Sequence, residues 1–328
     1  MKLASLKKGG RDGSLVVVSR NLSHYVSVAD ISPTLQAALD NWHQAAPRLN
    51  ARYEELNQGT CPDIQELDVK SLAAPLPRAF EFVDGSAYLP HVERVRRARG
   101  AKVPESFYVD PLMYQATSAG FLGPRDPVPV VSEEYGIDFE SEIIVITDDV
   151  PMAVTAENAE AHIQLVGLIN DVSLRNLIPA ELAKGFGFLQ SKPRSALSPV
   201  LVTPDELGEH WQDAKLSLPL HSTLNGAFFG EPEAGVDMQF NFAQLVAHAA
   251  KTRPLTAGTI VGSGTIANED TSKGASCLAE IRMLEIIADG KPSTPFMKFG
   301  DTIRIEMFDQ QGDSVFGAIE QKIVPHES

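Results

Sequence analysis

The sequence predicts a β-rich α+β fold for most of the chain. Short apolar segments separated by Gly- and Pro-containing turns dominate the region after residue 72. Helical periodicity is confined there to four segments, at 91–99, 155–163, 178–186 and 240–251. A doubly wound sheet would instead show a regular alternation of strands and helices.

The N-terminal region has a pattern of its own. An apolar strand at 15–19 precedes a helical pattern at 35–56, and Pro47 lies inside that pattern. We expect Pro47 to interrupt the helix, because proline lacks an N–H group and clashes with the preceding turn. Several Gly and Pro residues follow. We therefore predict a small N-terminal domain at 1–72 and a large domain at 73–328.

The charge balance excludes two classes of partner. The chain of 328 residues has 28 Lys and Arg against 43 Asp and Glu, a net charge of -15, which disfavours nucleic acid and anionic membrane surfaces. Its apolar runs fall short of the ~20 residues that a membrane span needs. The two cysteines, Cys61 and Cys277, have no metal-binding spacing and agree with a reducing compartment, so we expect a cytoplasmic protein.

Three carboxylates occur at alternate positions in the segment 136–147. Its β-branched second half predicts a strand, in which Asp138, Glu140 and Glu142 share one face. The same face continues into apolar residues. Because burying like charges costs several kcal/mol, these side chains require protonation or a cation, and we favour a cation.

Two further carboxylates are candidates for the same site. Asp171 follows the apolar run 163–170, where an Asp is commonly a helix N-cap, and Asp84 precedes a glycine, where an Asp is commonly a turn residue. If both converge with Glu140 and Glu142, the ligand set consists of oxygen alone. Such a set favours Mg²⁺, Ca²⁺ or Mn²⁺ over zinc and copper.

His91 and Lys192 are the remaining candidates. His91 lies at the start of a predicted helix and is either structural or a general base, since its ordinary pKa is close to working pH. Lys192 lies in a Gly-rich loop and is either solvated or part of a site. The sequence contains no Walker loop, GxSxG, HExxH or complete GxGxxG, so nucleotide binding and serine hydrolysis lack support.

These residues belong to a longer series of motifs. Over about 75–325, the motifs and their order along the chain resemble those of the fumarylacetoacetate hydrolase family. Within that family the resemblance is closest to the bacterial fumarylacetoacetases. The motifs are Pro75–Pro77, Asp84 with His91, Pro104–Phe107, Asp138–Glu142, Asn170–Arg175, Gln190–Lys192, Leu197–Pro199, Leu224–Gly226, Gly258–Thr265 and Phe299–Asp301.

The resemblance implies a mixed β-roll in the large domain and a homodimer. It also implies a divalent cation, Mg²⁺ or Ca²⁺ with Mn²⁺ as a further candidate, and it leaves Asp138 as a bystander at the start of the strand. The implied metal ligands are Asp84, Glu140, Glu142 and Asp171.

The implied reaction is hydrolysis of 4-fumarylacetoacetate, a small diketo acid, to fumarate and acetoacetate in tyrosine and phenylalanine breakdown. His91 would deprotonate the attacking water, and Glu280 would orient His91. Three further residues, Lys192, Arg175 and Thr265, would surround the developing negative charge.

Two departures from the family pattern leave other functions open. Ile178 and Ser86 occupy positions where the family's fumarylacetoacetases carry a substrate-binding Gln and Tyr. The alternatives within the family are an acylpyruvate hydrolase, an oxaloacetate-type decarboxylase and a dienedioate isomerase. A protein that binds a metal or metabolite without catalysis is the alternative from another class.

Overall fold

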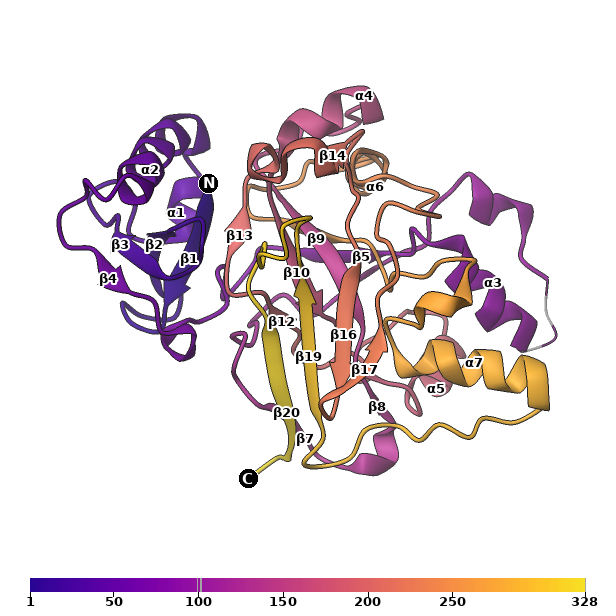
Figure 1. Ribbon diagram of the computed structural model, residues 1–328. Coiled ribbons are helices and arrows are strands. Elements are labelled where there is room, and N and C mark those ends of the chain that lie inside the picture. The colour runs from indigo at the N-terminus through magenta and orange to yellow at the C-terminus, as the bar shows by residue number, and fades with distance from the viewer. Residues whose placement is uncertain (99, 101, 328) are drawn as a thin grey trace.

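The computed structural model describes residues 1–98, 100 and 102–327 and is built around two large sheets (Figure 1). The larger sheet has mixed strand directions, with β18 parallel to β5 and antiparallel to β9. Its strands, in spatial order, are β4 (Gln65–Glu66), β3 (His24–Ser27), β2 (Ser14–Val18), β1 (Lys2–Leu6), β13 (Leu201–Val202), β10 (Ile163–Asn170), β9 (Ser141–Thr147), β18 (Ile260–Gly262), β5 (Phe82–Gly85) and β6 (Met113–Gln115), with β12 (Ala196–Leu197) beside β10.

The second sheet is also mixed, because β20 and β7 run parallel while its other pairs are antiparallel. Its order is β17 (Ala227–Gly230), β16 (Leu220–Leu224), β19 (Thr302–Met307), β20 (Ile319–Pro325) and β7 (Val128–Val130). Two small ladders pair β8 (Ile137–Asp138) with β11 (Ser173–Leu174), and β14 (Trp211–Gln212) with β15 (Lys215–Leu216). The prediction of a β-rich α+β fold is confirmed.

The helices lie around the sheets, and the two most N-terminal ones pack against strands β1 and β2 (Figure 1). They are α1 (Leu35–Leu39), α2 (Trp42–Asn57), α3 (Leu89–Ala98), α4 (Ala156–Ala159), α5 (Ile178–Leu182), α6 (Phe242–Ala249) and α7 (Leu278–Asp289). Each of the four predicted segments overlaps a helix, although α3 begins two residues before the first segment, and residue 99 at the end of that segment lies outside the described residues. Within the described ranges, none of the helices is both long and apolar enough to cross a membrane.

Helix α7 was not predicted, because its start signal comes from a distant part of the chain. Its N-cap is Cys277, which is not one of the residues that usually begin helices. The free N–H groups of Leu278 and Ala279 donate instead to the carboxylate of Asp138, at 2.8 and 2.9 Å. Local sequence therefore marks only the end of the helix, at Gly290, whose φ is 78°.

The prediction that Pro47 interrupts the helical pattern was wrong, since α2 runs through it. Pro47 is exposed, and the bond that it removes would have joined its nitrogen to the carbonyl of His43, which is also exposed. Water can therefore replace the missing hydrogen bond. The buried residues Leu49 and Tyr53 then hold the helix on the sheet.

The carboxylate segment forms two strands and not the single strand that was predicted. β8 ends at Asp138, and β9 begins at Ser141 between β10 and β18, in the middle of the larger sheet. At the break, the N–H of Glu140 donates to Asn170 Oδ1, and its carbonyl accepts from the N–H of Asp171. The break therefore brings Glu140 next to Asp171.

The N-terminal strands extend the larger sheet. β1 pairs with β2 on one side and with β13 on the other, where Lys2 is opposite Val202. Apolar residues of the first 56 positions share one buried cluster with Ile144 and Ile146 of β9. A boundary between domains at residue 72 stays a prediction.

Candidate active site

Three buried carboxylates meet near the ends of three central strands of the larger sheet. Asp84 lies in β5, Glu142 in β9, and Asp171 directly after β10, and their exposed fractions are 3%, 0% and 1%. One oxygen atom from each lies within 4.8 Å of the others. The order of the central strands thus brings together three carboxylates that are distant in sequence.

The electrostatics of this group match a cation. Burial and the charge of Asp171 raise the pKa of Asp84 to about 7, and burial with the charge of Asp84 raises the pKa of Glu142 well above its usual range. The Oε2 atom of Glu142 is buried and has no hydrogen-bond partner in the part of the chain that the structure describes. A hard divalent cation fits this set, because it would bind the free oxygen and offset the repulsion.

Glu140 lies beside the three carboxylates but bonds to two cations. Its oxygens accept from Arg175 Nη2 at 2.7 Å and from Lys192 Nζ at 2.5 Å, and also from the hydroxyls of Ser173 and Thr265. Burial alone would raise the pKa of Glu140, but Arg175 and Lys192 outweigh it and lower the pKa. Its role as a metal ligand stays a prediction.

Lys192 is buried, with an exposed fraction of 6%. Its Nζ atom bridges Glu140 Oε2 at 2.5 Å and Asp171 Oδ2 at 2.6 Å, and it lies 5.3 Å from the centre of the Tyr114 ring. Burial would lower its pKa, but the two carboxylates raise it. The ammonium group is therefore charged, and the alternative of a solvated surface lysine was wrong.

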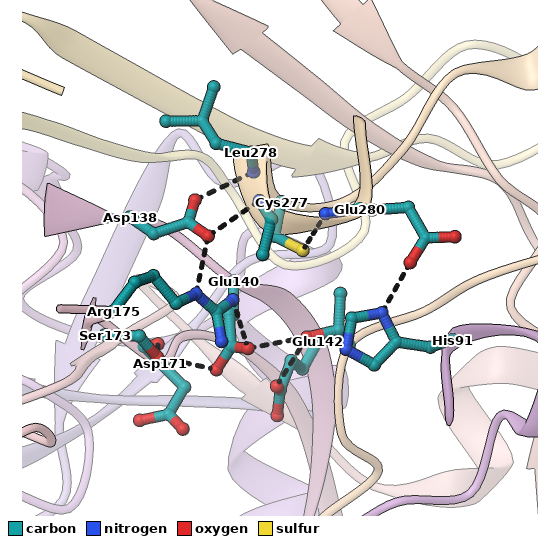
Figure 2. A network of polar contacts seen from close by, with 12 residues as sticks. His91, Asp138, Glu140, Glu142, Asp171, Ser173, Arg175, Cys277, Leu278 and Glu280 are labelled. Atoms are coloured by element: carbon teal, nitrogen blue, oxygen red, sulfur yellow. Dashed lines mark hydrogen bonds and ion pairs between the residues drawn. The ribbon is translucent and has the colours of Figure 1, made fainter. Parts of the chain in front are cut away.

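Arg175 and Asp138 connect the site to α7. Arg175 Nε donates to Asp138 Oδ2 at 2.8 Å, while Asp138 also accepts the first N–H groups of the helix (Figure 2). Asp138 is fully buried, and burial raises its pKa although Arg175 opposes the shift. Asp138 was expected to be a bystander, and the structure gives it a structural role.

His91 and Glu280 form a hydrogen-bonded pair. His91 Nδ1 lies 2.5 Å from Glu280 Oε2, and Figure 2 shows the pair together with Glu140 and Glu142. Glu280 is 1% exposed and also accepts a hydrogen bond from Arg94. Burial would raise the pKa of Glu280, but His91 and Arg94 lower it. An ionised Glu280 fixes the proton on Nδ1 and leaves Nε2 free to accept a proton.

Sequence reasoning missed several polar partners of these residues. Tyr114, opposite Asp84 in the β5–β6 ladder, donates its hydroxyl to Asp171 Oδ2 at 2.7 Å. Ser195 donates to Asp171 Oδ1 at 2.6 Å. These partners lie 57 and 24 residues from Asp171, so local spacing gives no signal for them.

A β-rich fold that buries a carboxylate group suited to a divalent cation beside a His–Glu pair is typical of metal-dependent enzymes. Residues 81–324 match the family model for the C-terminal part of fumarylacetoacetate (FAA) hydrolase, and residues 1–78 match fumarylacetoacetase N-terminal domain 2. The chain belongs to the fumarylacetoacetate hydrolase family, whose members are enzymes. The predicted family is confirmed.

Known proteins similar to the chain have different activities. It is 26% identical over 223 residues to a 2,4-didehydro-3-deoxy-L-rhamnonate hydrolase of Sphingomonas sp. (strain SKA58), covering 63% of this chain and 69% of the relative. Fumarylacetoacetate hydrolase from Exiguobacterium antarcticum shares its fold, with a TM-score of 0.67 and 18% identity over 99% of this chain and 100% of the other. Maleylpyruvate hydrolase from Sphingobium sp. SYK-6, solved with manganese(II) and pyruvate, has a TM-score of 0.66 and 15% identity over the full length of both chains.

Proposed function

We propose that the protein is a metal-dependent hydrolase that cleaves a carbon–carbon bond in a 1,3-diketo acid. The observation that carries this proposal is the position of the His91–Glu280 pair, which Figure 2 shows beside Glu142 of the three-carboxylate group. A carboxylate group without a base would suit metal binding alone, and a base without the metal would lack a means of polarising the substrate.

Asp84, Glu142 and Asp171 would hold the divalent cation, with Glu140 as the fourth ligand predicted from the family. Mg²⁺, Ca²⁺ and Mn²⁺ all suit oxygen ligands. When bound, such a cation supplies a Lewis acid for the two oxygens of a 1,3-diketone. The maleylpyruvate hydrolase structure with manganese(II) supports a divalent cation in this fold.

The chain's own residues would carry the proton transfers. His91 Nε2 takes a proton from water, whose oxygen adds to the substrate carbonyl, and Glu280 offsets the charge of the imidazolium. The carbon–carbon bond then breaks, and its electron pair leaves on the departing carbon as an enolate. The proton on His91 returns to that carbon. Lys192 stabilises the negative charge through these steps.

Arg175 and Thr265 are the proposed substrate-binding residues. Arg175 is fixed by Asp138 and Glu140, and Thr265 donates to Glu140 Oε1 at 3.0 Å. Both side chains are thus held by carboxylates of the site. They would contribute to binding as preorganised groups, which need no reorganisation when the substrate charge develops.

4-Fumarylacetoacetate is the first candidate substrate, and acylpyruvates are the second. Ile178 is buried, begins α5 and has no side-chain hydrogen-bonding group. The substrate tail would therefore meet an apolar side chain where the family's fumarylacetoacetases present an amide. The maleylpyruvate hydrolase fold neighbour supports including acylpyruvates.

The test follows the ultraviolet absorbance of a panel of 1,3-diketo acids with purified protein and Mg²⁺ or Mn²⁺. The proposal expects turnover that EDTA abolishes and that His91→Gln lowers by ~10²-fold or more. Product analysis separates hydrolysis from decarboxylation and isomerisation. Complete inactivity on the panel, with metal bound, would favour a binding protein.

A further inference from the structure

Glu181 is a buried carboxylate to which the proposed reaction assigns no role. It lies in α5 with an exposed fraction of 7%. The buried carboxylates of Asp138, Glu140 and Asp171 each pair with Arg175 or Lys192, but no ion pair to Glu181 is found among the described residues. Its partners are backbone and hydroxyl groups of a single loop.

These contacts fasten the last residues before Lys192. The carboxylate oxygens accept the N–H groups of Leu189 at 3.1 Å, Gln190 at 2.6 Å and Ser191 at 3.1 Å, and the Ser191 hydroxyl at 2.5 Å. Three consecutive amides thus point at one side chain. The next residue along the chain is Lys192.

We propose that Glu181 is a positioning residue that holds the loop 183–191 against α5, so that the Lys192 ammonium group lies between Glu140 and Asp171. The catalytic consequence rests on the proposed function, whereas the positioning itself does not. The hydrogen bonds found for Glu181 in the described structure all go to residues 189–191 and none to Glu140 or Asp171, so its effect on Lys192 passes through the loop.

The shape of the loop explains why the hydrogen bonds of Glu181 matter. Gly185 and Gly187 have φ values of 77° and 87°, and Phe186 between them is 98% exposed. The tip of the loop is thus unsupported on that side. At its far end, Leu174 N–H donates to Ser191 O and Thr117 Oγ1 donates to Lys192 O. Those bonds hold Ser191 and Lys192 in place, whereas Glu181 holds the residues that lead into them.

The charge of Glu181 suits this role. Burial opposes ionisation, but the hydroxyl of Ser191 and the loop amides lower the pKa of Glu181 to about 2. The anion can accept from all four donors at once. Gln at this position has the same shape but only one acceptor oxygen, and its NH₂ group would face N–H donors.

Glu285 provides a matched control. It accepts the N–H and hydroxyl groups of Ser293 and Thr294, and therefore fastens the turn after α7 by the same chemistry. No residue of the proposed reaction follows that turn. Glu285→Gln consequently tests whether loosening any loop is enough to disturb the site.

The first experiment measures the accessibility of Lys192 without using activity. The Mg²⁺-loaded wild type, Glu181→Gln and Glu285→Gln are treated with acetic anhydride, and lysine acetylation rates are read by peptide mass spectrometry. Lys192 should react roughly tenfold faster or more in Glu181→Gln than in the other two proteins. The exposed Lys291 should react equally in all three. Equal rates at Lys192, or an increase in Glu285→Gln as well, would overturn the proposal.

The second experiment uses turnover of the diketo acid on which the wild type is active. Glu181→Gln should lower kcat by roughly tenfold or more with a smaller change in KM, because Lys192 acts on charge that develops during the reaction. An unchanged kcat would refute the catalytic consequence. An inactive wild type with the expected labelling pattern would refute the proposed function and still support the positioning role.

Ser191→Ala decides the question if Glu181→Gln does not fold. It removes one of the four donors and leaves the charge of Glu181 and the three amide bonds in place. Faster acetylation of Lys192 than in the wild type supports the positioning role of Glu181. An unchanged rate in this variant refutes it.

Discussion

Lys192 Nζ lies 2.6 Å from Asp171 Oδ2, so an ammonium group and the proposed metal share one carboxylate. Each lowers the negative charge available to the other. Removing the ammonium group should therefore affect metal binding and catalysis in opposite directions.

Lys192→Met tests this relationship. The variant should bind Mn²⁺ several-fold more tightly by calorimetry, because Asp171 and Glu140 lose a competing cation. Its kcat should fall by ~10²-fold, the usual cost of removing a charge that stabilises a developing anion. Weaker metal binding would indicate that Lys192 instead orders the ligands.

Glu142→Gln should remove the dependence on divalent cations. The side chain is fully buried, and its Oε2 atom has no hydrogen-bond partner in the described structure. The neutral amide should leave the protein folded, with no shift of Tm on adding Mg²⁺ and no turnover. Full activity in this variant would rule out the metal role of Glu142.

The stability of the protein without divalent cations should fall as pH rises from about 4 to 8. Asp84 has its pKa raised from 3.8 to about 7, and the pKa of Glu142 is also raised, so the folded state holds protons that the unfolded state has lost. Stability therefore decreases with pH across this window. Tm measured with EDTA should show this slope, and saturating Mg²⁺ should reduce it. A Tm that rises with pH in EDTA would contradict the assignment.

Arg94→Met should disturb the His91–Glu280 pair. Arg94 donates to Glu280 and, through Nη2, to the carbonyl of Asn268 at 2.6 Å. Without Arg94 the Glu280 carboxylate loses one of the groups that hold it in place, so it orients His91 less well and kcat should fall by about tenfold with a smaller change in KM. Arg94→Lys should recover part of the loss.

Arg96→Met is the control for Arg94→Met. Arg96 lies on the same helix, and its guanidinium group lies 5.0 Å from the ring centre of Phe107. The kcat of this variant should match the wild type. An equal loss in both variants would indicate a general effect of charge on α3.

The local pattern predicted the carboxylates but not their partners. Alternation along β9 indicated that Glu142 enters the core, and the motif order indicated Asp84 and Asp171. The bonds from Tyr114 and Ser195 to Asp171 depend on which strands are neighbours, which residue spacing does not contain. Helix α7 was missed for the same reason, because its first N–H groups donate to Asp138 of the distant strand β8.

The Pro47 error has a different physical origin. Sequence reasoning assigned it the full cost of a missing hydrogen bond and a clash. The position is exposed, and the buried residues of α2 pack on the sheet on either side of it. Tertiary packing therefore outweighed a local preference, as it commonly does in helices.

The apolar cluster shared by the N-terminal region and β9 links the first part of the chain to the strand that carries Glu142. Ile144 and Ile146 lie on the same face of β9 as Glu142 and pack in one cluster with Leu3, Leu35 and Leu39. The strand that carries Glu142 thus depends for part of its packing on residues from far earlier in the chain. A cavity at Leu39 would cost stability in a cluster that includes this strand, so a change outside the candidate site can affect the element that carries it.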